Sequence, residues 1–146
     1  MKTSAQRAAE TRRAYAFEDE CVRSSYLLKR RTLKHLRSIA TRLWKAEGRT
    51  DAIPIIEFGI GALQAGRRLS FCIGIKGQCR IVLAKPERNI LTLLHELVHA
   101  LGHEYAFHDV RFVSKAIAFY VRYGRCKEVE LVLGANTLGI RVKMLS

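Results

Sequence analysis

The sequence His-Glu-Leu-Val-His at residues 95 to 99 constrains the fold of this chain more than any other stretch. It lies within residues 89 to 102, where apolar side chains recur at helical spacing, at positions 90, 94, 97, 98 and 101. This pattern predicts a buried helix that ends at Gly102. His95 and His99 are four residues apart on that helix, so both imidazoles can bind one metal ion from the same face.

Glu96 follows the first histidine and is expected to lie beside the ion rather than on it. A carboxylate in this position can take a proton from a water molecule that the metal activates. We therefore expect Glu96 to be a general base, and we expect zinc, which histidine ligands favour. Histidine is scarce, with five in the chain, and four of them lie between residues 95 and 108. This concentration argues against a chance pairing.

A catalytic zinc site has three protein ligands and one open position, so a third ligand is required. The candidates just after the helix are His103, Glu104, His108 and Asp109. His103 would lie about 12 Å from His95 along a straight helix, which is too far, and it suits the end of the helix better. The chain can turn back after Gly102, so we predict His108 as the third ligand. A downstream acid, either Glu128 or Glu130, is the alternative.

The segment His-Glu-Leu-Val-His-Ala at residues 95 to 100, followed by His-Asp-Val-Arg-Phe at 108 to 112, resembles the SprT-like and WLM group of zinc metallopeptidases. Their pattern is HExxH, a variable gap, and then a histidine with a phenylalanine four residues later. The resemblance covers about residues 84 to 124, and short phage and plasmid members look especially similar. Asp109 stands where the family often has glycine.

The resemblance implies a zincin-like fold and a peptidase that hydrolyses peptide bonds. It implies zinc ligands at His95, His99 and His108, a catalytic Glu96, and a Phe112 that packs under the metal helix. It also implies a substrate class, protein bound or crosslinked to DNA, as for Spartan-type enzymes. Oxyanion stabilisation could come from Tyr105, Tyr123 or His103.

Helix and strand patterns predict a single α+β domain over residues 16 to 146, preceded by a basic arm over residues 1 to 15 that is flexible or a frayed helix. We expect one long helix from Phe17 to Ala46, where the chain has no Gly or Pro. A small, mostly antiparallel sheet should follow, with strands at 53–60, 69–75 and 78–84, the last two joined by a hairpin at Lys76-Gly77 after a connection over 61–68. A second helix at 113–123 and a terminal hairpin at 129–133 and 138–144 complete the expected fold.

Charge points to a polyanionic partner. The chain has 26 Lys and Arg against 13 Asp and Glu, a net charge of +13, and nucleic acid is the commonest partner of such a protein. The apolar side of the expected N-terminal helix leaves a basic side opposite it. We expect DNA to bind there, through Arg31, Lys34, Arg42 and Lys45.

The four cysteines are widely spaced and form no paired motif. This usage indicates a reducing, intracellular setting without a disulfide framework. The first twenty residues contain no apolar core segment, so we expect neither a signal peptide nor a membrane span. The expected location is the cytoplasm, with association to the nucleoid if the protein binds DNA.

Two other functions compete with a peptidase that acts on DNA-associated proteins. One is a DNA-binding module with a structural zinc and no proteolysis, although structural sites usually have a fourth Cys or His ligand. The other is a regulatory peptidase that cuts one repressor or host factor.

Overall fold

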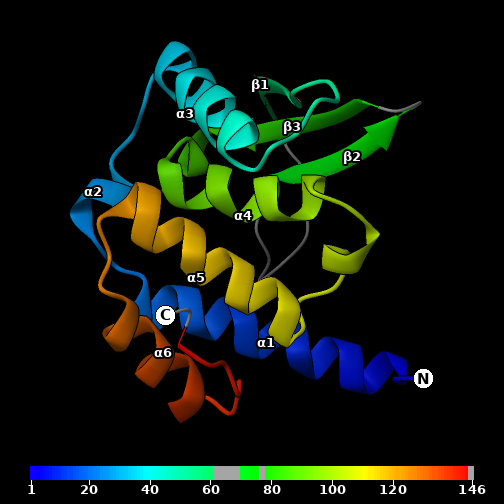
Figure 1. Ribbon diagram of the computed structural model, residues 1–146, viewed down its shortest axis with the longest axis vertical. Coiled ribbons are helices and arrows are strands. Elements are labelled where there is room, and N and C mark those ends of the chain that lie inside the picture. Colours follow the sequence, from blue (N-terminus) through cyan, green and yellow to red (C-terminus); the bar gives the residue numbers. More distant parts are fainter. Residues whose placement is uncertain (61–69, 76–77, 145–146) are drawn as a thin grey trace.

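The computed structural model describes residues 1–60, 70–75 and 78–144, and shows a mixed α+β fold. The sheet and helix α3 (Leu33–Ala46) lie at one end of the molecule. Helices α4 (Ile90–Ala100) and α5 (Val110–Gly124) form the middle, and α1 (Ser4–Cys21) and α6 (Glu128–Thr137) lie at the other end (Figure 1). The α+β class expected from the sequence is thus observed.

The prediction of one helix from Phe17 to Ala46 is wrong. The chain forms the end of α1, a short helix α2 (Ser25–Leu28) and α3. Two hydroxyl side chains explain the breaks: Ser24 accepts a hydrogen bond from the backbone of Leu27, and Thr32 accepts one from that of His35. Each starts a new helix as its N-cap, which is where Ser and Thr compete best with helix continuation.

Residues 4–15, for which the sequence left a flexible arm or a frayed helix open, belong to α1. The helix begins with a capping box. The backbone nitrogen of Gln6 donates to the Thr3 hydroxyl, and the backbone nitrogen of Thr3 donates to the Gln6 side chain. Ala14 and Phe17 are each 1% exposed and belong to the hydrophobic core. Helix α1 is therefore packed as part of the domain.

The sheet has three strands, β1 (Ile55–Gly59), β2 (Phe71–Ile75) and β3 (Gln78–Ala84), in the order β1-β3-β2. β2 pairs with β3 in antiparallel fashion as expected, but β1 pairs with β3 in parallel, so the sheet is mixed rather than mostly antiparallel. A parallel partner is possible because a long connection separates the two strands. The expected turn at Lys76-Gly77 and connection at 61–68 lie outside the described residues.

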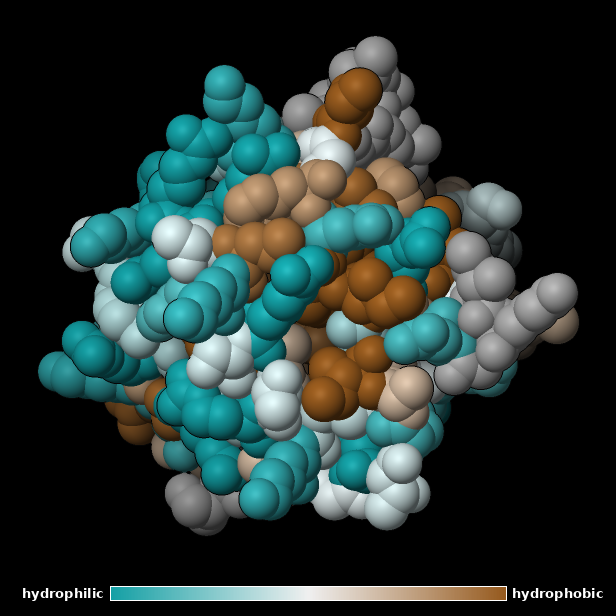
Figure 2. Space-filling model, turned by 90° about the horizontal axis from the view of Figure 1, so that it is seen from above, coloured by the Kyte–Doolittle hydropathy of each residue, from teal (hydrophilic) through white to brown (hydrophobic). Residues whose placement is uncertain are grey.

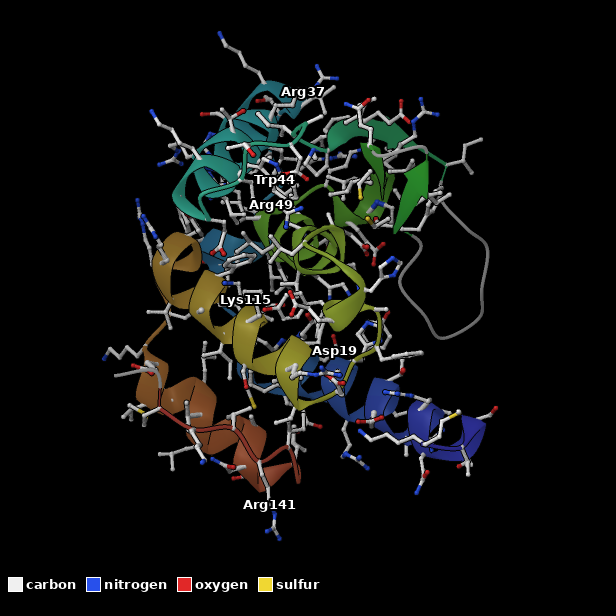
Figure 3. The ribbon with its side chains drawn as sticks, turned by 45° about the vertical axis from the view of Figure 1, so that its right-hand side comes forward. Asp19, Arg37, Trp44, Arg49, Lys115 and Arg141 are labelled. Carbon is white, nitrogen blue, oxygen red and sulfur yellow. The ribbon has the colours of Figure 1, made fainter. Side chains whose placement is uncertain are left out.

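The two edges of the sheet differ. The Arg37 side chain of α3, labelled in Figure 3, donates two hydrogen bonds to the carbonyl oxygen of Ile56, at 3.2 and 3.0 Å. This contact occupies a backbone group of β1 that an added strand would need. The other edge is β2, which lies over α4.

The C-terminal segment is helical, and the predicted terminal hairpin is wrong. Leu131, Val132 and Ala135 of α6 are buried at helical spacing, and Glu128 and Glu130 lie in its first turn, where acidic side chains stabilise a helix. A Cβ at Gly134 would lie 2.5 Å from the Cys21 sulfur, so the missing side chain permits close packing of α6 on α1.

The surface above the sheet carries apolar side chains. Figure 2 shows hydrophobic residues gathered in the middle of this face, surrounded by hydrophilic ones. A groove of about 310 Å³ lies between α3 and the start of β1, with Ile53 and Ile55 partly exposed along it. No helix in the described part of the chain has both the length and the apolar character needed to span a membrane.

Candidate metal centre

The structure brings His95, His99 and His108 together. The first two lie on α4, and a single 3₁₀ turn (His103–Tyr105) after Gly102 reverses the chain so that His108 approaches them from outside the helix. The Nε2 atom of His108 lies 3.1 Å from that of His99 and 3.1 Å from that of His95. The expected third ligand is therefore placed beside the first two.

The outer nitrogen of each imidazole faces an oxygen. Nδ1 of His95 donates to Glu18 Oε2 at 2.7 Å, and Nδ1 of His99 donates to the carbonyl oxygen of Tyr105 at 2.8 Å. Nδ1 of His108 lies 3.4 Å from Thr11 Oγ1, whose own proton goes to the Arg7 carbonyl. Because a neutral imidazole carries one proton, these partners leave the lone pairs of all three Nε2 atoms directed inward.

Three inward lone pairs are unfavourable unless a cation or protons lie between them. Zinc bonds to histidine of about 2.0–2.1 Å place two ligand nitrogens of a tetrahedral site about 3.3 Å apart. The Nε2 separations here, 3.1 Å, are close to that value. The three histidines thus lie close enough to bind one metal ion, and the donor set fits zinc.

Helix α1 supplies the support for this cluster, which the sequence did not reveal. Glu18 is 2% exposed, and its Oε2 also accepts a hydrogen bond from the Tyr120 hydroxyl of α5. The Tyr15 ring stacks on His95, with ring centroids 5.5 Å apart and planes at 11°. Glu18 shares the buried face of α1 with Ala14 and Phe17, at helical spacing, but nothing local in the sequence pairs it with His95.

Phe112 packs against all three histidines, as the resemblance implied. Its ring centroid lies 4.8 Å from those of His95 and His108 and 4.6 Å from that of His99. The buried Phe112 ring thus restricts the orientation of all three imidazoles. Asp109, the departure from the family pattern, is the N-cap of α5 and accepts hydrogen bonds from the backbone of Arg111 and Phe112.

Burial and the neighbouring His95 lower the pKa of His99 to about 4. The cause is mainly desolvation, which disfavours the charged imidazolium. At neutral pH His99 is therefore uncharged, which is the form that binds a metal.

The histidines open onto a cleft of about 560 Å³ between α4 and β2. Glu96 is 4% exposed and lines this cleft. Other lining residues come from α1, β2, β3 and the turn after α4: Tyr15, Phe71, Cys72, Cys79, His103 and Ala106. Burial, together with Cys79 and Glu96, raises the pKa of the Cys72 thiol, so this sulfur is protonated rather than a thiolate ligand.

The other candidates lie at different places relative to the three histidines. Of the three side chains offered as oxyanion donors, His103 is among the residues that line the cleft; Tyr105 gives its backbone oxygen to His99, and the Tyr123 ring packs against Phe119 on α5. Glu128 and Glu130, the alternative third ligands, lie on α6 and outside the metal-binding group found among the described residues.

Three of the four residues expected to bind DNA lie on α3, and the fourth, Arg31, lies before it. Lys34, Arg42 and Lys45 are exposed on α3. Arg31 precedes that helix and is half-buried: it donates to the Tyr26 carbonyl at 2.7 Å, and its guanidinium carbon lies 4.6 Å from the centre of the Tyr26 ring.

Comparison with known proteins gives no match to a family model, to a curated protein or to a solved structure.

Proposed function

We propose that this protein is a zinc-dependent metallopeptidase of the zincin type. One observation supports this most: three Nε2 lone pairs converge beside a buried glutamate at the wall of an open cleft. A structural zinc site would be closed by a fourth ligand. Among the described residues no fourth His, Cys, Asp or Glu joins the three histidines, and this favours catalysis over a structural role.

Each side chain has a task in peptide hydrolysis. Zinc, when bound, activates a water molecule and polarises the scissile carbonyl. Glu96 lies in the cleft next to His95, where its carboxylate can accept the proton of that water and deliver it to the leaving amine. His103, on the cleft wall, is the side chain we assign to the developing oxyanion.

The sheet edge beside the cleft suits an extended peptide. β2 is an edge strand that contributes Phe71, Cys72 and Gly74 to the cleft lining. The opposite edge is occupied at Ile56 by Arg37. A substrate strand would thus add to β2 and pass its carbonyl groups over the histidines.

The net charge of +13 supports nucleic acid as the second partner, so we propose that the substrates are proteins associated with DNA. Dependence of cleavage on DNA separates this proposal from a regulatory peptidase with one soluble target. Binding of DNA without any cleavage would favour the non-catalytic module.

The test combines metal content with turnover. We expect about one zinc per chain in wild type and in Glu96→Gln, and loss of most of the zinc in His108→Ala, by elemental analysis of protein purified without added metal. Wild type should cleave denatured casein, or histone on single-stranded DNA, and Glu96→Gln should lose at least about 100-fold in rate because its amide cannot accept the proton.

Glu104→Gln is the matched control, since Glu104 lies outside the cleft lining and its substitution should change neither quantity. Normal cleavage by Glu96→Gln would show that the assigned base is wrong. Full zinc retention in His108→Ala would show that the three histidines do not form the metal site.

A further inference from the structure

A second cavity, at the opposite end of α4 from the histidine cleft, is lined by positive charge. It has a volume of about 480 Å³ and is lined by Leu28, Arg30, Lys85, Pro86, Arg88 and Asn89. Three of these six residues are cationic and none is acidic. We refer to it as the basic pocket, and we propose that it binds the phosphodiester backbone of a nucleic acid.

The backbone around the basic pocket is held in place. The segment between α2 and α3 is joined to the segment before α4 by a hydrogen bond from the Arg31 nitrogen to the Arg88 carbonyl, at 2.9 Å. The Arg30 guanidinium also reaches the Lys85 carbonyl, at 3.4 Å. The cations therefore come from two segments that are fixed relative to each other, which lowers the entropic cost of binding an anion.

The charges of the basic pocket are not neutralised. In residues 1–60, 70–75 and 78–144, no ion pair involves Arg30, Lys85 or Arg88. Glu87, the acid next to them in sequence, has one carboxylate oxygen engaged outside the pocket: its Oε1 accepts hydrogen bonds from the backbone nitrogen and the hydroxyl of Ser70, both at 2.8 Å. The pocket thus keeps its positive potential.

Arg88 is positioned as an anion ligand. Its guanidinium carbon lies 4.2 Å from the centre of the Phe58 ring, which orients the side chain. Its Nε is buried and has no hydrogen-bond partner. The Arg88 side chain is also one of the residues that line the basic pocket, where a guanidinium can donate to phosphate oxygens.

The lining favours phosphates over bases. None of the six lining residues is aromatic, so the pocket offers no ring for base stacking, and its cations favour contacts to the charged phosphates. Binding should therefore be independent of sequence. Asn89 and His99 are ten residues apart, or about 15 Å along a helix, so a protein attached to the bound strand could reach the histidine cleft.

The inference depends on the proposed function only in the choice of nucleic acid as the partner. The test measures binding of the zinc-loaded full chain to a labelled single strand of twenty nucleotides and to the matching duplex, by fluorescence anisotropy over a range of salt. We compare Arg30→Gln/Lys85→Gln with Arg42→Gln/Lys45→Gln, which removes the same charge from exposed positions on α3.

The slope of log K against log salt is negative. We expect the basic-pocket pair to reduce its magnitude by about 1.8 on duplex DNA, and to weaken the affinity roughly 10- to 100-fold near 0.1 M salt. The α3 pair should reduce the magnitude of the slope by less than half as much. Lys85→Gln alone, which removes an exposed side chain without a hydrogen bond among the described residues, should lower it by about 0.9.

Equal losses in the two pairs, or a larger loss in the α3 pair, would overturn the assignment. So would an unchanged affinity for both DNA probes together with lost binding to phosphatidylserine vesicles, which would identify a membrane surface as the occupant. Because no cleavage is measured, failure of the basic pocket is distinguishable from failure of the peptidase proposal.

Discussion

At the scale of single residues, the buried carboxylate of Glu18 is a direct support of the candidate metal centre. It accepts hydrogen bonds from His95 and from Tyr120, and so joins α1, α4 and α5 at one oxygen atom. A carboxylate behind a ligating histidine fixes the tautomer and raises the basicity of the other nitrogen. Glu18 is thus a positioning residue for His95.

Glu18→Gln should weaken zinc binding roughly 10- to 100-fold, because the charge behind His95 is lost while the shape of the side chain is kept. Competition with a chromogenic chelator measures this affinity. Asp19→Asn is the control, since Asp19 is exposed on the next position of α1 (Figure 3) and should leave the affinity unchanged. If both variants bind zinc like wild type, Glu18 has no positioning role.

At the scale of elements, α4 is fixed at both ends. Its N-cap is Asn89, whose side chain accepts a hydrogen bond from the Thr92 nitrogen at 2.8 Å. At the other end, the Arg49 guanidinium donates to the Leu101 carbonyl at 2.6 Å and lies over the Trp44 ring, as the neighbouring labels in Figure 3 indicate. These contacts satisfy backbone groups that a helix end leaves unpaired.

Asn89→Ala should lower the free energy of unfolding by about 1 kcal/mol, because the N-terminal N–H of α4 loses its acceptor in a buried position. Urea denaturation of the protein, kept free of metal by a chelator, measures the change. Asn89→Asp, which keeps an acceptor oxygen and adds charge favourable to a helix N-terminus, should retain most of the stability. An equal loss in both variants would attribute the effect to packing rather than to the cap.

At the scale of the whole molecule, a metal ion would join segments that are distant in sequence. The ligands come from α4 and from the loop before α5, and the partners of their outer nitrogens come from α1 and from the 3₁₀ turn. An ion that binds the folded state and not the unfolded chain stabilises the fold in proportion to its occupancy.

Free zinc at 100 times its dissociation constant should stabilise the protein by about 2.7 kcal/mol, which raises the Tm by roughly 5–11 °C for a chain of this size. Thermal unfolding followed by circular dichroism, with and without a chelator, measures the shift. His108→Ala should lose most of it, whereas His35→Ala, at an exposed position on α3, should keep it. A shift that survives in His108→Ala would mean that zinc stabilises the protein elsewhere.

The sequence alone determined the features that depend on local pattern. The apolar spacing around His95 and His99 identified α4, and the alternation after residue 69 identified β2 and β3, because helices and strands bury one face at fixed periods. The distance along a helix excluded His103 as a ligand and favoured His108, which the structure places beside the other two.

Tertiary structure alone decided what depends on contacts between distant segments. β1 joined β3 in parallel, and the last segment became α6 against α1 rather than a hairpin. The breaks at Ser24 and Thr32, by contrast, come from local caps that the search for Gly and Pro did not consider. Glu18 acquired its role from His95, seventy-seven residues away. Packing of the whole chain decides which partner a buried polar side chain meets. A short window of local sequence therefore cannot predict that partner.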